Sequence, residues 1–252
     1  MQDVYLEQSS SNGGLQRVVF NMITPYLRAF DRKSAQRVDL FIANSQFVKK
    51  RIKKFYGRDS TVIHPPCEID KFNVCETKGD FYLIVSALTP YKRVDLAIEA
   101  CKRLQKKLIV IGTGPEEKKL RKIAHSGVVF LGQQPFEVLA DYYAQAKALL
   151  FPGVEDFGIT PLEAMASGTP VIALGKGGVL ESVIEGKTGL FFMEQTAVGL
   201  METIEKFESE NYCFDTQDCR KRAEEFSPEI FRKKIKSFLA EKYPNIFPLS
   251  HW

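Results

Sequence analysis

The chain has 252 residues, of which 44% are hydrophobic and 26% charged, and its formal net charge is +4. This content suffices for one large domain or two small ones, and the mild charge argues against nucleic acid as a partner, since nucleic-acid binding needs a concentrated basic stripe. No apolar run approaches the roughly 18 residues that span a bilayer. The five cysteines show no CxxC spacing, so we expect reduced thiols and a cytoplasmic protein.

Residues 1–75 contain too few elements for a complete domain. A first helix is expected to break near Pro25, and residues 37–45 read as a single strand with a polar end. A second helix starts at the N-cap Ser45 and stops at Gly57. One strand and two helices predict the remnant of a larger N-terminal domain, followed by a hinge.

From residue 80 onward, short apolar runs alternate with stretches of helical spacing. Continuous apolar strands that alternate with helices are typical of a parallel sheet covered on both faces. The fold class is therefore α/β, with a doubly wound, parallel Rossmann-like sheet over residues 76–216 and a C-terminal helix and tail over 217–252. The predicted strands are 80–88, 106–112, 127–132, 147–152, 169–174 and 188–192, and the predicted helices are 93–104, 115–124, 135–146, 160–167, 178–186 and 196–208. Such sheets bind ligands at the carboxyl ends of their strands.

Two carboxylates in "PGVEDFGITPLEAMASGTPVIA" (152–173) lie at this edge. Glu163 follows Thr160 by three residues, so the two could form a capping box at the start of a short helix. A helix cap does not require Glu155 or Gly158. A glycine at position 158 would let a ligand approach the backbone closely. Carboxylates are good acceptors for sugar hydroxyls. A ligand contact is favoured for Glu155, whereas cap and ligand contact are equally plausible for Glu163.

Two cations follow the first strand of the predicted sheet. Lys92 and Arg93 begin a helix, where a positive charge opposes the helix dipole unless an anion is bound. A diphosphate would be such an anion, because Arg offers a planar fork and Lys a point charge. The alternative is a pair of solvated cations that Asp95 compensates locally. We expect Lys92 and Glu155 to meet in one crevice with Glu163.

Other chemistries lack a pattern in this sequence. "GTGPE" has no third glycine for a dinucleotide fingerprint, and "EGKTG" is not a phosphate-loop motif. His64, His125 and His251 are widely separated, and neither HExxH nor GxSxG occurs. The sequence therefore supports no metal site and no catalytic triad.

The quoted stretches, together with "LTPYKRVDLAIEA", "VIGTGPE" and "GGVLESV", resemble family-4 retaining glycosyltransferases of the two-Rossmann-domain (GT-B) architecture over residues 36–240. The likeness is greatest to bacterial mannosyltransferases of sugar-polymer synthesis. It implies transfer of a hexose, mannose in the first instance, from a nucleotide-diphosphate sugar such as GDP-mannose to a saccharide or lipid-linked acceptor, in cell-surface polysaccharide synthesis. Neither a metal nor another cofactor is implied.

The resemblance also implies residue roles. Glu155 contacts the sugar hydroxyls, while Lys92 and Arg93 neutralise the diphosphate as catalytic groups. The donor-binding residues implied are Phe157, Gly158, Ile159, Thr160, Glu163 for the ribose, and Gly132 near the base. The family commonly has an arginine five residues before the lysine, where this chain has Ala87. One diphosphate contact is thus missing, which should weaken leaving-group stabilisation.

The family's N-terminal domain provides the acceptor site, and residues 1–75 match only its end. We therefore expect a partner chain to supply the rest. The rival hypothesis is a truncated or degenerate module that binds nucleotide sugar without transfer; an epimerase or phosphorylase of the same architecture finds no supporting residues. The basic helix after Ser45 could also place the protein peripherally at the inner membrane face, but packing of its apolar side inside the protein explains the pattern equally well.

Overall fold

The computed structural model describes residues 14–209 and 212–247, and it divides into two units, Met1–Val62 and Ile63–Trp252. The division falls before the predicted boundary at residue 75. The reason is that Cys67, Ile69 and Phe72 are buried in the core of the second unit. Residues 63–75 therefore belong to the sheet domain rather than to the N-terminal remnant.

Within its described residues, 14–62, the first unit contains two helices and two very short strands. They are α2 (Gly14–Ala35), β1 (Ile42–Ala43), α3 (Gln46–Tyr56) and β2 (Thr61–Val62), and β1 pairs with β2 in parallel. The predicted break in the first helix is wrong, because α2 continues through Pro25. The two helices are joined by a hydrogen bond of 2.7 Å from the Tyr56 hydroxyl to Asp31 Oδ2.

Helix α3 has the predicted ends. The Ser45 side chain accepts a hydrogen bond from the Val48 amide, and Gly57 adopts the left-handed conformation at φ 66°. Ile52 on its apolar side is buried, so this side packs at least in part inside the unit. Association of α3 with a membrane stays a prediction.

The second unit contains a parallel sheet in the order β5-β4-β3-β6-β7-β8. Its strands are β3 (Tyr82–Val85), β4 (Leu108–Ile111), β5 (Val128–Gly132), β6 (Ala148–Phe151), β7 (Val171–Leu174) and β8 (Gly189–Phe192). All six lie within predicted strands. The order is that of a doubly wound Rossmann-type sheet, which confirms the expected fold class.

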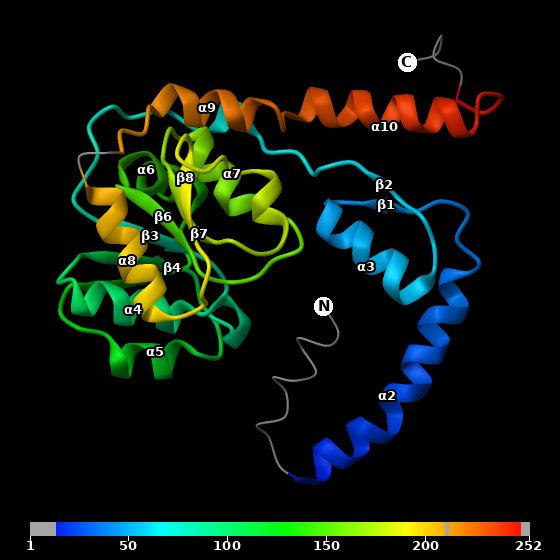
Figure 1. The fold of residues 1–252 in the computed structure, drawn as a ribbon, viewed down its shortest axis with the longest axis horizontal. Helices are drawn as coiled ribbons and strands as arrows, with labels where there is room; N and C mark the ends of the chain where they lie inside the picture. The colour runs from blue at the N-terminus through cyan, green and yellow to red at the C-terminus, as the bar shows by residue number, and fades with distance from the viewer. Residues whose placement is uncertain (1–13, 210–211, 248–252) are drawn as a thin grey trace. The chain divides into compact units, whose positions relative to one another are not determined.

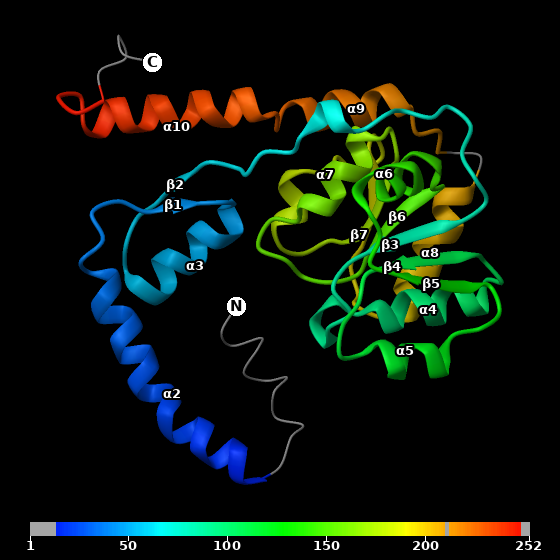
Figure 2. The same ribbon diagram turned by 180° about the vertical axis from the view of Figure 1, so that it is seen from behind.

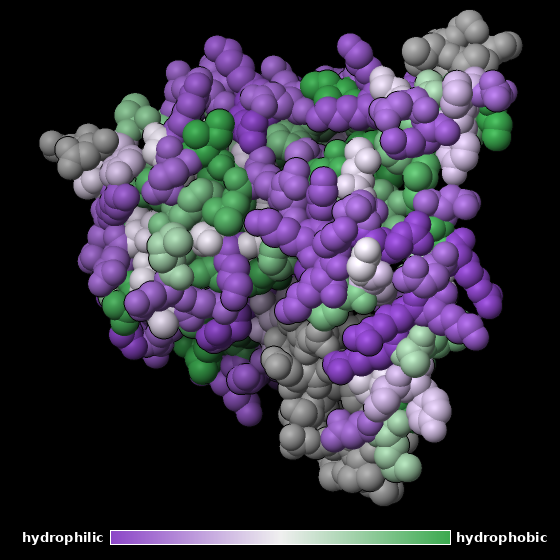
Figure 3. Space-filling view, turned by 45° about the vertical axis from the view of Figure 1, so that its right-hand side comes forward, coloured by the Kyte–Doolittle hydropathy of each residue, from purple (hydrophilic) through white to green (hydrophobic). Residues whose placement is uncertain are grey.

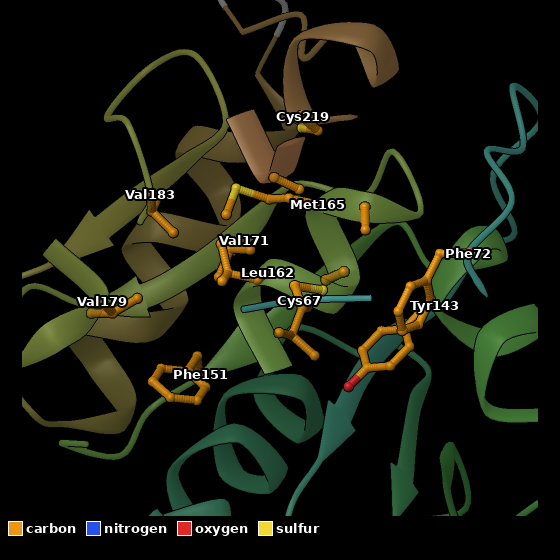
Figure 4. Close-up of a cluster of buried hydrophobic side chains, with 14 of the residues drawn as sticks. Cys67, Phe72, Tyr143, Phe151, Leu162, Met165, Val171, Val179, Val183 and Cys219 are labelled. Carbon is orange, nitrogen blue, oxygen red and sulfur yellow. The ribbon is translucent and has the colours of Figure 1, made fainter. Parts of the chain in front are cut away.

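Helices cover both faces of this sheet (Figures 1 and 2). One layer comprises α4 (Val94–Arg103), α5 (Glu117–Ile123) and α8 (Ala197–Glu208), and the other α6 (Phe136–Gln145), α7 (Ile159–Ala166) and α9 (Thr216–Glu224). Alternate residues of a strand pack against opposite helix layers. In β6, Leu149 and Phe151 belong to the core on the α7 side, whereas Ala148 and Leu150 belong to the core on the α4 side. Figure 4 shows the core on the α7 side.

Two segments differ from the sequence prediction. Residues 178–186 form only the 3-10 turn η4 (Gly178–Glu181) instead of a helix. Helix α9 was not predicted, because its run "TQDCRKRAE" is mostly polar and buries only Cys219 and Ala223. The last helix, α10 (Pro228–Lys242), begins at the N-cap Ser227 as its sequence suggests.

The surface is mixed in character. Hydrophilic side chains predominate on the face shown in Figure 3. Within the described residues, no helix combines the length and the apolar composition needed to cross a bilayer. Helix α2 exposes a set of large apolar side chains, namely Met22, Ile23, Tyr26, Leu27 and Phe30.

Candidate nucleotide-sugar site

The candidate site lies where the direction of strand progression reverses. From β3 the chain proceeds to β4 and β5 on one side of the sheet, whereas β6, β7 and β8 extend on the other. The loops that follow β3 and β6 therefore diverge at the carboxyl edge, and in open α/β sheets of this order the ligand-binding crevice lies at that point. The predicted cations follow β3, and the predicted carboxylates follow β6.

Lys92 and Glu155 are in direct contact at this crevice. The Lys92 ammonium donates to Glu155 Oε1, and the two side chains are only 14% and 21% exposed. Lys92 closes the short turn η3 (Pro90–Lys92) after β3, and Glu155 lies in the loop between β6 and α7. Lys92 and Glu155, which come from separate turns, are thus in contact at this edge of the sheet.

Arg93 is adjacent to Lys92 but has its own partner. Its backbone is left-handed at φ 53°, an uncommon conformation for a residue with a side chain, and it joins η3 to α4. Its guanidinium donates from Nε and Nη2 to the two Asp95 oxygens, at 3.1 Å and 3.0 Å. The structure therefore contains the local compensation by Asp95 that the sequence allowed.

Glu163 is placed differently from the capping-box prediction. Helix α7 begins at Ile159, its N-cap is Gly158 at φ 89°, and no side chain caps it. Thr160 consequently lies inside the first turn, and Glu163 is too far along the helix to reach the cap. The Glu163 carboxylate instead accepts a hydrogen bond of 2.7 Å from the Tyr143 hydroxyl on α6. The capping interpretation of Glu163 is wrong.

Burial controls the protonation of this pair. Desolvation raises the pKa of Glu163 above its usual value, and the hydrogen bond from Tyr143 partly opposes that rise. The pKa of Tyr143 is raised well above 10 because its hydroxyl is buried beside the same carboxylate. Tyr143 is thus a neutral donor that favours the ionised form of Glu163.

Phe157 lies in the core rather than at the surface of the crevice. It is 2% exposed, stacks on His64 with 5.4 Å between ring centroids, and packs against Phe226 at 5.8 Å. The His64 ring also contacts Glu181, with 2.9 Å between Nε2 and Oε2. The ring of Phe157 therefore anchors the loop that contains Glu155 to the core. Direct contact of this ring with a ligand stays a prediction.

A glycine pair holds the same loop from the side of β7. The Gly178 amide donates to the Glu155 carbonyl at 2.9 Å. A Cβ on Gly178 would lie 2.3 Å from the Asp156 carbonyl oxygen and 2.4 Å from Phe157 Cα, so a side chain is excluded there. The glycine at this position therefore allows close packing of the backbone against the Glu155 loop.

The remaining predicted residues lie at the same edge without forming a common cluster. Gly132 ends β5 at φ 68° and has open space around its Cβ position. Ile159 is 45% exposed at the start of α7. The structure thus joins Lys92 to Glu155, but it pairs Glu163 with Tyr143.

Three contributing residues were not recognised from the sequence: Tyr143, His64 and Glu181. Tyr143 resembles any other apolar member of its helix, and His64 was considered only as a metal ligand or a base. Their partners are distant along the chain, so no local spacing reveals them. The one available signal was the polar Glu181 after Gly177 and Gly178, which a turn alone would not require.

The comparisons with known proteins decide the family. The model for glycosyl transferases group 1 matches residues 68–226, which is more than half of the chain and includes β3 to α9. This chain belongs to the glycosyl transferases group 1 family. The expected resemblance to GT-B, mannosyltransferase-like glycosyltransferases is confirmed.

Relatives of this group 1 glycosyltransferase include several mannosyltransferases. Human alpha-1,3/1,6-mannosyltransferase ALG2 is 29% identical over 245 residues, with 81% of this chain and 58% of ALG2 covered. A GDP-mannose-dependent phosphatidylinositol monomannoside mannosyltransferase of Mycolicibacterium smegmatis is 28% identical, with 66% and 52% covered. The chain spans about half the length of the curated relatives it matches.

Solved structures agree on the fold. Sucrose-phosphate synthase from Thermosynechococcus elongatus aligns with a TM-score of 0.78 at 20% identity, covering 95% of this chain and 66% of that one. Anabaena HepE in complex with UDP and glucose aligns with a TM-score of 0.72 at 21% identity, covering 81% and 63%. At these identities the likeness concerns the fold alone.

Proposed function

We propose that the second unit binds a nucleoside-diphosphate hexose, GDP-mannose in the first instance, and serves as the donor half of a retaining hexosyltransferase in cell-surface polysaccharide synthesis. The observation that carries the proposal is the contact between Lys92 and Glu155 at the switch point between β3 and β6. A cation and a carboxylate, both largely shielded from water, suit a ligand with an anionic diphosphate and a hydroxylated sugar.

In the proposed complex, Lys92 lies between Glu155 and the diphosphate, and both side chains contact the ligand. Lys92 turns its ammonium to the diphosphate, with Arg93 nearby, and stabilises the negative charge that grows on this leaving group. Glu155 accepts hydrogen bonds from sugar hydroxyls. The bond from the anomeric carbon to the diphosphate breaks, the bond to the acceptor oxygen forms on the same face of the sugar, and the proton of the acceptor hydroxyl passes to the departing diphosphate oxygen. Glu163 accepts from the ribose, and the backbone at Gly132 lies near the base.

The proposed donor follows the relatives rather than the fold neighbours. The mycobacterial relative is described as GDP-mannose-dependent, and an O-antigen chain mannosyltransferase of Salmonella typhimurium is 31% identical over 159 residues. The UDP bound to HepE comes from a structure of only 21% identity. Mannose and guanine are therefore the first choices, with UDP sugars as the comparison in the experiment.

We propose that the acceptor side of this enzyme requires more polypeptide than residues 14–62, the described part of the first unit. Two parallel strands of two residues each, with α2 exposing a row of apolar side chains, are supports for a larger sheet rather than a complete binding domain. We propose that a further polypeptide supplies that part and the site for a saccharide or lipid-linked acceptor. The rival function is a nucleotide-sugar-binding module without independent transfer.

Two measurements test these proposals in sequence. Isothermal titration compares GDP-mannose, GDP, UDP-glucose and UDP with the wild type and with Lys92→Ala; absence of binding by the wild type to every one of them refutes donor binding. Transfer of radiolabelled mannose to saccharide and lipid-linked acceptors is then measured with and without EDTA. Transfer that persists in EDTA supports metal-independent catalysis, whereas donor binding without transfer by the chain alone favours the binding module.

A further inference from the structure

Tyr143 makes a contact that packing alone does not explain. Its side chain is fully buried on α6, and its hydroxyl donates to Glu163 Oε2 at 2.7 Å. The other carboxylate oxygen, Oε1, has no hydrogen-bond partner within residues 14–209 and 212–247. One oxygen of Glu163 is therefore held by the protein, while the other is left for a ligand hydroxyl.

The tyrosine is itself held in place by several contacts. Thr169 Oγ1 donates to the Tyr143 carbonyl at 2.6 Å, and the Lys78 ammonium donates to Thr169 Oγ1 at 2.9 Å and to the Ala144 carbonyl at 2.8 Å. The Phe72 ring meets the Tyr143 ring edge to face, with 6.0 Å between the ring centroids. Both side chains are labelled in Figure 4. Because the Tyr143 ring is buried and the end of α6 is fixed by these hydrogen bonds, the Tyr143 hydroxyl is held in one position.

Glu163 gains both direction and charge from this contact. A glutamate side chain has several rotatable bonds, so an unsupported carboxylate would lose rotational freedom when it binds a ligand. The hydrogen bond from Tyr143 opposes the rise in the pKa of Glu163 that burial causes. An ionised and oriented carboxylate is the better acceptor for the two hydroxyls of a ribose.

We propose that Tyr143 is a positioning residue for nucleotide recognition: its hydroxyl holds Glu163 so that Oε1 faces the ribose of the donor. The inference rests on the proposed role of Glu163 and adds the residue on which that role depends. Tyr143 itself does not touch the ligand.

Neighbouring titratable groups do not replace this hydrogen bond. The pKa of Cys67, whose thiol is influenced by Glu163, is raised to about 12 by burial, so this thiol stays neutral. Arg220 on α9 donates to the carbonyls of Phe72 and Ala166, at 2.7 Å each. Among the described groups that act on Glu163, Tyr143 is the one that donates to its carboxylate.

The experiment compares Tyr143→Phe with a matched control, Tyr82→Phe. Tyr82 is also buried and donates to a carboxylate, Glu208 Oε1 at 2.8 Å, but it lies at the amino end of β3. Each variant is titrated with GDP and with 2′,3′-dideoxy-GDP, or with UDP and its dideoxy form if the wild type prefers uracil. Loss of one hydrogen bond predicts about fivefold to tenfold weaker ribonucleotide binding by Tyr143→Phe.

The dideoxynucleotide distinguishes positioning from general damage. For Tyr143→Phe we expect its affinity to stay within about twofold of the wild type, because the ribose contact is then absent in both proteins. We also expect the loss of GDP affinity to grow as the pH falls towards the raised pKa of Glu163, because Glu163 without its donor protonates more readily. Tyr82→Phe should change neither affinity.

Several outcomes would overturn the inference. These are unchanged GDP binding by Tyr143→Phe, or equal losses of GDP and dideoxy-GDP. A second set, Glu163→Ala with and without Tyr143→Phe, guards against misfolding: a further loss of GDP affinity on adding Tyr143→Phe to Glu163→Ala refutes positioning through Glu163. Failure of the wild type to bind any nucleotide would instead refute the proposed function itself.

Discussion

The contact between Lys92 and Glu155 makes an unusual prediction about GDP binding. Replacing Lys92 by alanine should weaken binding, and replacing Glu155 by glutamine in the same protein should restore part of the affinity. The reason is that Lys92 neutralises Glu155 in the free protein and would lie between Glu155 and the diphosphate in the complex. Without the lysine, two negative groups face each other.

The magnitude follows from the geometry. Two hydrogen bonds of about 3 Å on either side of the ammonium place the carboxylate within about 6 Å of the diphosphate. At an effective dielectric constant of about 20, two unit charges at that distance repel by about 3 kcal/mol. Because Lys92 and Glu155 are 14% and 21% exposed, water screens part of this repulsion. We expect the double variant to recover about 1–2 kcal/mol, or about fivefold to thirtyfold in affinity.

The assay is isothermal titration of GDP against the wild type, Lys92→Ala, Glu155→Gln and the double variant at one salt concentration. A matched control is the pair Lys106→Ala and Glu208→Gln, since Lys106 Nζ and Glu208 Oε2 lie 2.5 Å apart at the opposite edge of the sheet. This control should leave GDP affinity unchanged. If the double variant binds GDP no better than Lys92→Ala, the proposed arrangement of charges is refuted.

Three further predictions concern the supports of the site. Because burial raises the pKa of Glu163 above 4.5 in the folded protein, the native state loses stability as the pH rises from 4.5 through the folded pKa. We therefore expect the Glu163→Gln variant to melt at an equal or higher temperature than the wild type at pH 7, and yet to bind GDP more weakly. A lower melting temperature of this variant would contradict the reasoning. Gly178→Ala should lower stability by about 1–3 kcal/mol in urea unfolding, because its Cβ would overlap the Asp156 carbonyl; wild-type stability would show that the loop yields freely. His64→Ala removes the stack on Phe157, so we expect affinity for GDP-mannose to fall more than affinity for GDP, and equal losses would exclude a role in sugar binding.

The strands illustrate what local sequence predicts well. The run "ALLF" in β6 is buried on both faces of the sheet. Its continuous apolar character predicts this burial from the sequence alone. The opposite case is η4, whose apolar residues suggested a helix. Glycines are needed at its start because the backbone there packs closely against the Glu155 loop. That loop precedes η4 by more than twenty residues, so a local pattern does not reveal the contact.

The two glutamates illustrate the same division. Glu155 was predicted to meet Lys92, because loops at the carboxyl ends of adjacent parallel strands share one edge. Glu163 was misassigned to a capping box, because three-residue spacing after Thr160 is a local pattern that the start of α7 at Ile159 makes irrelevant. The partner that Glu163 takes, Tyr143, lies on another helix.

The sequence by itself determined the α/β class, the parallel sheet and the edge at which charged groups gather. These features follow from hydrophobic periodicity, which each segment carries within about ten residues. Only the tertiary structure decided which charges pair, which carboxylate is buried beside Tyr143, and that Phe157 packs against His64 and Phe226. Those contacts join residues that are far apart along the chain, so they exist only once the sheet order has brought their elements together.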